Sequence, residues 1–333
     1  MTDFSKFEVK DGPVRKYATE FALNMVGNPV VFTQQQNLDD LSRPEVAERL
    51  QEEPCHIYMI CRRPRISINP ESFVASATSI SLEFIVHSQD AVLRFPTTAE
   101  NGFGTADLTL NSTYPHNLFV INDANGKRLR AKSGLMAANL RVPGISKYLD
   151  LEVLYVGQAY GNDGSRTAPD RLKSHATLQA IYAEALAQSP DKEIWLILWS
   201  FSPMLISSID GRWNKYLATN EEDDEHAEKV MEESITDQQK INFVEAALIK
   251  YFKPSFNVMF KNKFPSPAHA TYSKCYELDL NHLIVELNTE HISAKIFSET
   301  VPPEWHHTLN FNLHSLEERR SMFSVLIPEG YEK

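Results

Sequence analysis

Apolar residues recur at spacings of three and four between residues 236 and 252, and this pattern predicts an amphipathic helix. Its buried stripe is formed by Ile241, Val244, Leu248 and Phe252. Thr236 and Gln239 have the spacing of a capping box, and Pro254 is expected to end the helix. Glu245 lies inside the apolar stripe, so the pattern places a carboxylate on the face that packs into the core.

The segment before this helix alternates between predicted strands and helices. Leu151–Val156 reads as a strand that runs into Gly157, and Pro169 is expected to begin a helix that continues to about Ala187. Ile194–Phe201 is an uninterrupted apolar run of strand length. Such a run is typical of a central strand that is buried on both faces.

The first part of the chain shows two different patterns of predicted secondary structure. The first 60 residues are predicted to be helical, with Pro44 in the first turn of one helix. From Ile66 onward, the stretches Thr78–Val86 and Ala91–Phe95 are rich in β-branched and aromatic residues, which favours strands. Asn125-Gly126 is a strong turn signal within this β-rich part.

The end of the chain contains two runs in which apolar and polar residues alternate. The runs consist of Tyr276, Leu278 and Leu280, and of Leu309, Phe311 and Leu313. Alternation with a period of two predicts strands of a small appended sheet. The sequence therefore predicts an α+β protein in three parts, with a β-rich module over 1–138, a central domain over 139–265 and a β extension over 266–333.

The composition fits a soluble globular protein, because 42% of the 333 residues are apolar and 23% are charged. The formal net charge of −11 is unusual for a protein that holds a polyanion. Much of it comes from residues 221–233, where eight carboxylates and one lysine give −7. This acidic stretch is interpreted as an insertion at about 215–235, and it leaves the remainder only mildly acidic.

The three cysteines, Cys55, Cys61 and Cys275, are too few for a disulfide framework or a four-thiolate metal site. The first residues lack the basic and then apolar pattern of a signal peptide, and no apolar run is long enough to span a membrane. These features predict a cytoplasmic protein with free thiols and no membrane association.

A carboxylate inside an apolar helix stripe is costly unless another group compensates its charge. For Glu245 two interpretations are open at this point. It forms a buried ion pair or lies at the edge of the stripe, or it is a metal ligand or a catalytic acid or base.

Three separate elements together resemble the GIY-YIG endonuclease superfamily. The ending E-x2-LI-x2-F-x-P-x-FN, from Glu245 to Asn257, is similar to the helix and the downstream Asn of that family. Tyr155-Val156-Gly157 stands where the family has its second element, YIG, at the end of a strand. Arg171-x3-His175 stands where the family has an Arg on its first helix, with a His one turn later. The resemblance covers about 120 residues.

This resemblance implies a small antiparallel sheet flanked by helices, and a metal-dependent endonuclease. The family's first element, GIY, normally lies about ten residues before the second. Here Gly144-Ile145 is not followed by Tyr, so Tyr148 is the candidate for the missing phenol. The loop between Gly157 and Arg171 is longer than usual, and Arg166 competes with Arg171 for its role.

The same resemblance assigns roles to individual residues. Glu245 would bind one Mg²⁺ or Mn²⁺, and Arg171 would pair with the scissile phosphate. Tyr155 would position or deprotonate the attacking water, which requires nearby cations because a free phenol has a pKa near ~10. His175 would relay the proton, and Asn257 would hold the geometry. Further contacts to nucleic acid are expected from Gly157, Arg166, Lys173 and Lys261.

Two functions from different classes remain open on the sequence. The first is an endonuclease that acts on DNA, with RNA not excluded, in a restriction, mobile-element or phage-defence role. The second is a nuclease-like fold without activity that serves as a nucleic-acid-binding or regulatory module, which the unmatched first tyrosine and the net acidity favour. The pattern says nothing about the oligomeric state.

Overall fold

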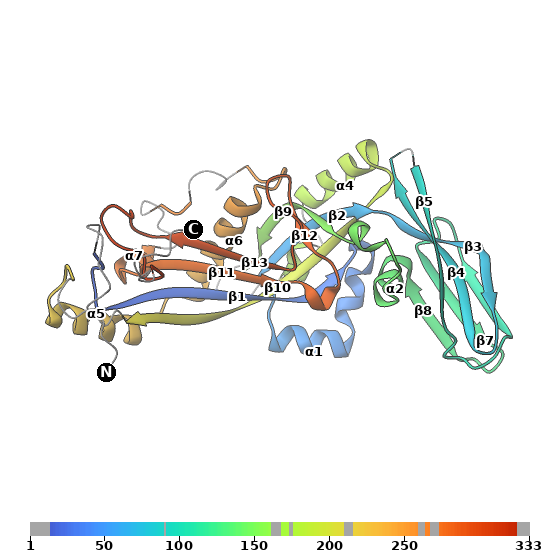
Figure 1. Cartoon of the computed structure of the whole chain (residues 1–333), viewed down its shortest axis with the longest axis horizontal. Helices are drawn as coiled ribbons and strands as arrows, with labels where there is room; N and C mark the ends of the chain where they lie inside the picture. Colours follow the sequence, from blue (N-terminus) through green and yellow to red (C-terminus); the bar gives the residue numbers. More distant parts are fainter. Residues whose placement is uncertain are drawn as a thin grey trace, which may run out of the picture.

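The computed structural model describes residues 14–89, 91–160, 168–172, 176–209, 216–258, 264–266 and 273–324. It is an elongated α+β protein with a body built on one large sheet and a β-rich arm at one end (Figure 1). The sheet of the body has seven strands in the described residues, and the arm has two sheets of three strands each.

The large sheet collects strands from the beginning, the middle and the end of the chain. They are β1 (Thr19–Thr33), β2 (Ile57–Pro64), β9 (Leu151–Gln158), β10 (Lys192–Ile209), β11 (His282–Asn288), β12 (Ile296–Phe297) and β13 (His306–Asn312). Their order in space is β12-β9-β2-β10-β1-β11-β13. The sheet is mixed, because β1 and β11 run parallel, as do β9 and β12, whereas the other neighbours are antiparallel.

Strand β10 forms the middle of this sheet, as its continuous apolar run predicts. Alternate residues of a strand point to opposite faces. Trp195 and Trp199 therefore enter the core on one face, and Leu196 and Leu198 enter the core on the other. All four side chains are buried, so the run Ile194–Phe201 is confirmed as a central strand.

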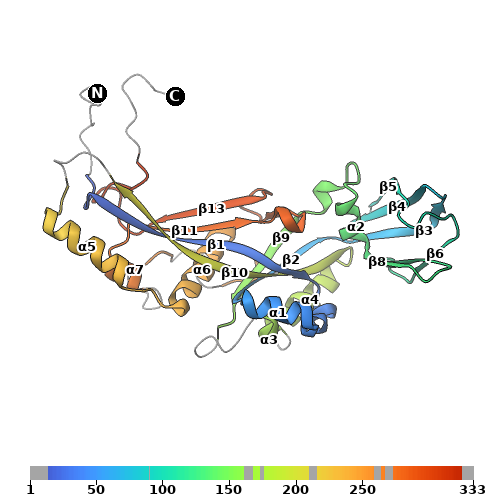
Figure 2. The same cartoon turned by 90° about the horizontal axis from the view of Figure 1, so that it is seen from below.

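The helices cover the two faces and the far end of the body. They are α1 (Pro44–Glu52), α3 (Ala168–Leu172), α4 (Ala176–Gln188), α5 (Asn220–Glu232), α6 (Asp237–Phe252) and α7 (Ser273–Glu277). Figure 2 shows α5 and α6 apart from α1, α3 and α4. The predicted acidic insertion is α5, which begins with a capping box between Thr219 and Glu222.

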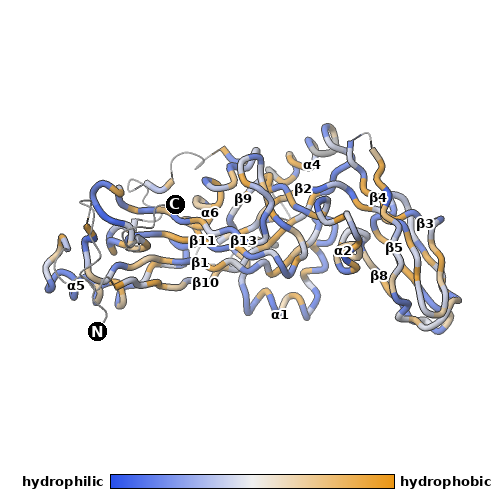
Figure 3. The backbone as a smooth tube through the Cα atoms, viewed as in Figure 1, coloured by the Kyte–Doolittle hydropathy of each residue, from blue (hydrophilic) through white to orange (hydrophobic). Residues whose placement is uncertain are grey.

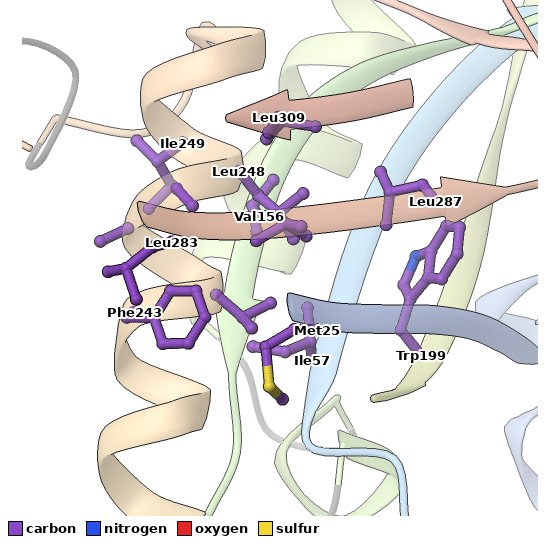
Figure 4. Close-up of a cluster of buried hydrophobic side chains, with 14 of the residues drawn as sticks. Met25, Ile57, Val156, Trp199, Phe243, Leu248, Ile249, Leu283, Leu287 and Leu309 are labelled. Atoms are coloured by element: carbon purple, nitrogen blue, oxygen red, sulfur yellow. The ribbon is translucent and has the colours of Figure 1, made fainter. Parts of the chain in front are cut away.

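Helix α6 fits its prediction closely. The Thr236 side chain accepts a hydrogen bond from the backbone N–H of Gln239, and the helix ends at Phe252. Phe243 and Leu248 pack into a core shared with Val156 of β9 and Leu283 of β11 (Figure 4). The helix is therefore fixed against β9, the strand that carries Tyr155.

The arm lies between β2 and β9 in the sequence. It consists of β3 (Ile66–Ala75), β4 (Ser79–Ser88) and β5 (Ala91–Glu100), followed by β6 (Leu108–Ser112), β7 (Leu118–Asp123), β8 (Arg128–Lys132) and the helix α2 (Ser133–Asn139). Apolar side chains of both arm sheets share one core with α2. The Asn125-Gly126 turn joins β7 to β8 as predicted, and Gly126 has a φ of +83°.

The structure corrects several expectations about the organisation of the chain. The first 60 residues are not all helical, because β1 is a strand of 15 residues. The stretch 1–138 is not one module, since β1 and β2 belong to the large sheet and the arm begins at β3. Tyr276 lies in helix α7 rather than in a strand, whereas the second alternating run forms β13. The sheet next to α6 is large and mixed, where a small antiparallel sheet was expected.

Two expectations from composition can be compared with the described residues. Cys55, Cys61 and Cys275 are free and buried. Within the described ranges, no helix combines the length and the apolar character that crossing a membrane requires.

Candidate active site

Two phenols from neighbouring strands meet at the candidate site. Tyr58 of β2 lies opposite Gly157 of β9 in the antiparallel register, and the rings of Tyr58 and Tyr155 have centroids 6.1 Å apart. Both tyrosines belong to the core on the side of the sheet covered by α3 and α4. The pairing therefore brings together two side chains that the arm separates in the sequence.

Gly157 makes this close approach possible. A Cβ atom at this position would lie 2.5 Å from Oη of Tyr58 and 2.7 Å from Cε1 of Tyr155. Real atoms do not approach so closely, so any larger residue would displace one of the phenols. Position 157 of the Tyr-Val-Gly element must therefore be a glycine, because the ring of Tyr58 occupies the space of a side chain.

Asn257 fastens the strand that carries Tyr155. Its side-chain oxygen accepts a hydrogen bond from the backbone N–H of Val156 at 2.9 Å, and its amide donates to the carbonyl of Val156 at 2.8 Å. The side chain is buried. Pro254 and the left-handed backbone of Lys253 turn the chain back from α6 to reach β9. The expected geometric role of Asn257 thus has a specific form, which is a two-point clamp on the backbone between Tyr155 and Gly157.

Arg171 reaches the two phenols from helix α3. Its Nε donates a hydrogen bond to Oη of Tyr58 at 3.2 Å. The guanidinium also interacts electrostatically with Glu245 and Tyr155. The two residues that the sequence placed on different helices, Arg171 and Glu245, therefore belong to one site.

Glu245 projects from α6 toward the end of β9 and is only partly buried. Its carboxylate accepts hydrogen bonds from the backbone and the side chain of Gln158. Burial raises the pKa of Glu245 to about 7, although the bonds from Gln158 and the charge of Arg171 act in the opposite direction. The carboxylate is thus poised to exchange a proton near neutral pH.

The residues around the two phenols do not lower their pKa, although the role that the resemblance gives Tyr155 needs a lowered pKa. Burial raises the pKa of Tyr155, and the charge of Glu245 adds to this, while Arg171 and a hydrogen bond with Tyr58 act against it. Burial likewise raises the pKa of Tyr58 well above its ordinary value. Arg171 alone is too weak to offset the loss of solvent around either ring.

Tyr148 does not join this group. It ends a short 3-10 helix, Ser146–Tyr148, and its ring packs edge-on against Phe95 of the arm at a centroid distance of 5.9 Å. The phenol beside Tyr155 comes instead from Tyr58. The available signal was Ile57-Tyr58. It lies about a hundred residues before Tyr155 because the arm intervenes, whereas the family's first element normally lies about ten residues before the second.

Four other predicted residues lie outside the described part of the chain. They are His175, Arg166, Lys173 and Lys261. Their proposed roles therefore stay predictions.

The donors at the site suit a hard divalent cation that keeps much of its water. Glu245 supplies one carboxylate, and the described residues contain no group of three His, Cys, Asp or Glu side chains that could enclose a metal. Mg²⁺ is commonly held by one or two carboxylates together with substrate phosphate and water. Glu245 therefore fits such an ion, and it does not fit a closed structural metal site.

Replacement of Asn257 by Ala is expected to lower the free energy of unfolding by about 2–4 kcal/mol, because the buried N–H and C=O of Val156 would both lose a partner. Urea unfolding of both proteins measures this difference. Asn310→Ala on the exposed side of β13 is the matched control and should change stability by no more than about 0.5 kcal/mol. Equal effects of the two substitutions would contradict the clamp.

The stability of the protein is expected to depend on pH through Glu245. The folded state raises the pKa of this group from 4.5 to about 7, so between these values the folded protein binds more protons than the unfolded chain. Stability is therefore lost as the pH rises from about 5 to about 7.5. Glu245→Gln has the shape of the protonated carboxyl group but cannot ionise. It should therefore remove the part of the stability loss that comes from ionisation of Glu245.

Urea unfolding of wild type and Glu245→Gln at about pH 5 and about pH 7.5 measures how the stability difference changes with pH. The advantage of the variant should grow by roughly 2–3 kcal/mol toward the higher pH. Glu228→Gln, at an exposed position of α5, is the control and should give parallel curves. A difference between wild type and Glu245→Gln that stays constant with pH would show that Glu245 ionises freely.

The site is thus built from two strands, two helices and the turn after α6. Tyr58, Tyr155, Arg171 and Glu245 face one another, and Asn257 holds the strand between them. Comparisons with known proteins found no matching family model, curated protein or solved structure.

Proposed function

We propose that this protein is a metal-dependent endonuclease that hydrolyses phosphodiester bonds, with DNA as its substrate. The proposal is carried by the meeting of two phenols, one guanidinium and one partly buried carboxylate at the clamped end of β9. The GIY-YIG resemblance of Tyr155, Arg171, Glu245 and Asn257 supports it, and Tyr58 supplies the phenol that the sequence lacked near Gly144.

The charges of the site suit a phosphodiester. Arg171 offers forked donors to the non-bridging oxygens of a phosphate. Its bond to Tyr58 uses Nε, so the terminal nitrogens can serve a substrate. The carboxylate of Glu245 would by itself repel a phosphate. It is compatible with a phosphodiester substrate if it binds a cation that lies between the two negative groups.

The two tyrosines divide the work on the attacking water. Tyr155 positions the water. Where nearby cations offset the effect of burial, its phenol can lose its own proton to solvent, and the resulting phenolate can accept a proton from the water. Tyr58 donates its hydroxyl proton within the site or orients Arg171 through the bond to Nε. Glu245 would hold a divalent ion, which would supply charge stabilisation at the leaving oxygen.

The second function, an inactive module that binds nucleic acid, makes a different forecast for the same protein. If this second function is correct, the protein binds DNA or RNA but does not cleave either in the presence of Mg²⁺ or Mn²⁺. The raised pKa of both phenols in the protein alone favours this alternative. Cleavage assays with DNA and RNA separate the two functions.

Purified protein with Mg²⁺ or Mn²⁺ is expected to nick or cut plasmid DNA, and Glu245→Gln should abolish cleavage because the carboxylate that holds the cation is lost. Glu228→Gln on α5 is the matched control and should cut like wild type. Gel electrophoresis of supercoiled, nicked and linear forms measures the rate. Cleavage by Glu245→Gln at the wild-type rate would refute the assignment of the metal ligand.

The identity of the first phenol gives a separate test. Tyr58→Phe keeps the ring and removes the hydroxyl bonded to Arg171, so the cleavage rate is expected to fall about 10²-fold or more. Tyr148→Phe makes the same chemical change in the core of the arm and should leave the rate within a factor of two to three. The reverse result would return the role to Tyr148.

A further inference from the structure

Strand β10 extends well beyond its neighbour β2. The antiparallel pairing with β2 covers Lys192–Trp199, whereas the pairing with β1 continues to Ile209. In the described residues, no strand pairs with Ser200–Ile209 on the β2 side. We call Ser200–Ile209 the free edge of the sheet.

Two prolines reveal which backbone groups point out from the free edge. Pro29 lies opposite Trp199, and Met25 lies opposite Pro203, in one unbroken register. Proline has no N–H, so neither pair can exchange both hydrogen bonds between β1 and β10. The backbone groups of Trp199 must therefore point away from β1, where they meet Ile57 of β2.

The same direction recurs at every second residue along β10. The outward-pointing positions of the free edge are therefore Phe201, Pro203, Leu205, Ser207 and Ile209. No hydrogen bond from another described residue reaches the outward backbone groups of Phe201, Leu205 or Ser207. These groups form a ready template for another strand.

The side chains of the free edge are uncharged and most of them are exposed, whereas Ser200, Phe201, Ile206 and Ser208 are partly buried. Met204 is 48% exposed, Leu205 is 44% exposed and Ile209 is 74% exposed. No residue from Ser200 to Ile209 carries a charge. Proteins commonly protect such an edge with charged residues or with Pro. Here Pro203 lies on the edge, and Asp237 and Lys240 of α6 line a pocket with Ser200, Phe201 and Pro203, so Met204–Ile209 is the least protected part.

We propose that the free edge pairs antiparallel with the same edge of a second copy of this chain, around a two-fold axis at Leu205. In this register the residues match by chemical type. Met204 faces the partner's Ile206, Ser202 faces the partner's Ser208, and Phe201 faces the partner's Ile209. Leu205 faces its own copy. Pro203 faces the partner's Ser207, and this pair forms one backbone hydrogen bond in place of two.

The self-matching register favours a second copy over an unrelated partner. Between Ser200 and Ile209 the two copies bring no charged residues together, and an isologous contact of this kind closes on itself as a dimer. The net charge of −11 on each chain opposes association at long range, so the contact depends on the apolar side chains and the backbone hydrogen bonds of the matched register.

The dimer has a consequence that rests on the proposed function. A two-fold axis relates the two active sites, and the two strands of duplex DNA are related by two-fold axes as well. Each site of the dimer could then cut one strand. The test of the dimer uses neither DNA nor metal, so its result is independent of nuclease activity.

Light scattering after size exclusion, at micromolar concentration, measures the mass in solution. Wild type is expected at twice the chain mass of 37.9 kDa. Leu205→Lys places two like charges at the axis and should halve the mass. Val92→Lys, at a 55% exposed apolar position of the arm strand β5, is the matched control and should remain a dimer.

Cross-linking tests the axis itself. The native cysteines are buried, so Leu205→Cys would add an exposed thiol. Directly opposed residues in a hydrogen-bonded pair have Cα atoms ~5.5 Å apart, within the range of a disulfide. Mild oxidation should therefore link Leu205→Cys into a dimer and leave Val92→Cys unlinked. A monomeric wild type, a dimeric Leu205→Lys, or failure of Leu205→Cys to link would each overturn the proposal.

Discussion

The antiparallel pairing of β2 with β9 is the constraint on which the candidate site depends. Tyr58 and Gly157 are opposite one another because β9 returns to β2 after the arm in a register that shifts by one residue between Ile60 and Cys61. A slip of one residue would turn Tyr155 to the other face of the sheet. Asn257 opposes such a slip, since it bonds both backbone groups of Val156 from the turn after α6. The register and the position of Glu245 are therefore fixed by the same segment.

The site combines partial burial with few charges. One guanidinium and one carboxylate lie beside two phenols. Burial raises the pKa of Glu245 even though the charge of Arg171 lowers it. Such a site holds its groups in place before a substrate arrives, but it leaves negative charge poorly compensated. Binding of a cation would relieve this imbalance, which connects the electrostatics of the protein to the proposed chemistry.

The large sheet carries the three features of the molecule. The arm is inserted between the two tyrosine strands and has its own core. The candidate site lies at the end of β9, next to α3 and α6. The free edge belongs to the distal half of β10, which projects with β1 beyond the end of β2 (Figure 3).

The sequence by itself determined the elements whose signals are local. The stripe and cap of α6, the buried run of β10 and the turn at Gly126 follow from periodicity and turn chemistry within a few residues. Periodicity singled out Glu245, because it interrupts the apolar stripe of α6, whereas Tyr155, Arg171 and Asn257 became candidates only through the resemblance to the GIY-YIG family. Only the tertiary structure decided that Tyr58 is the second phenol, that Tyr148 belongs to the arm and that β1, β11 and β13 complete one sheet. Pairing between strands depends on contacts across a hundred or more residues, and local patterns carry no record of which distant strand will lie alongside.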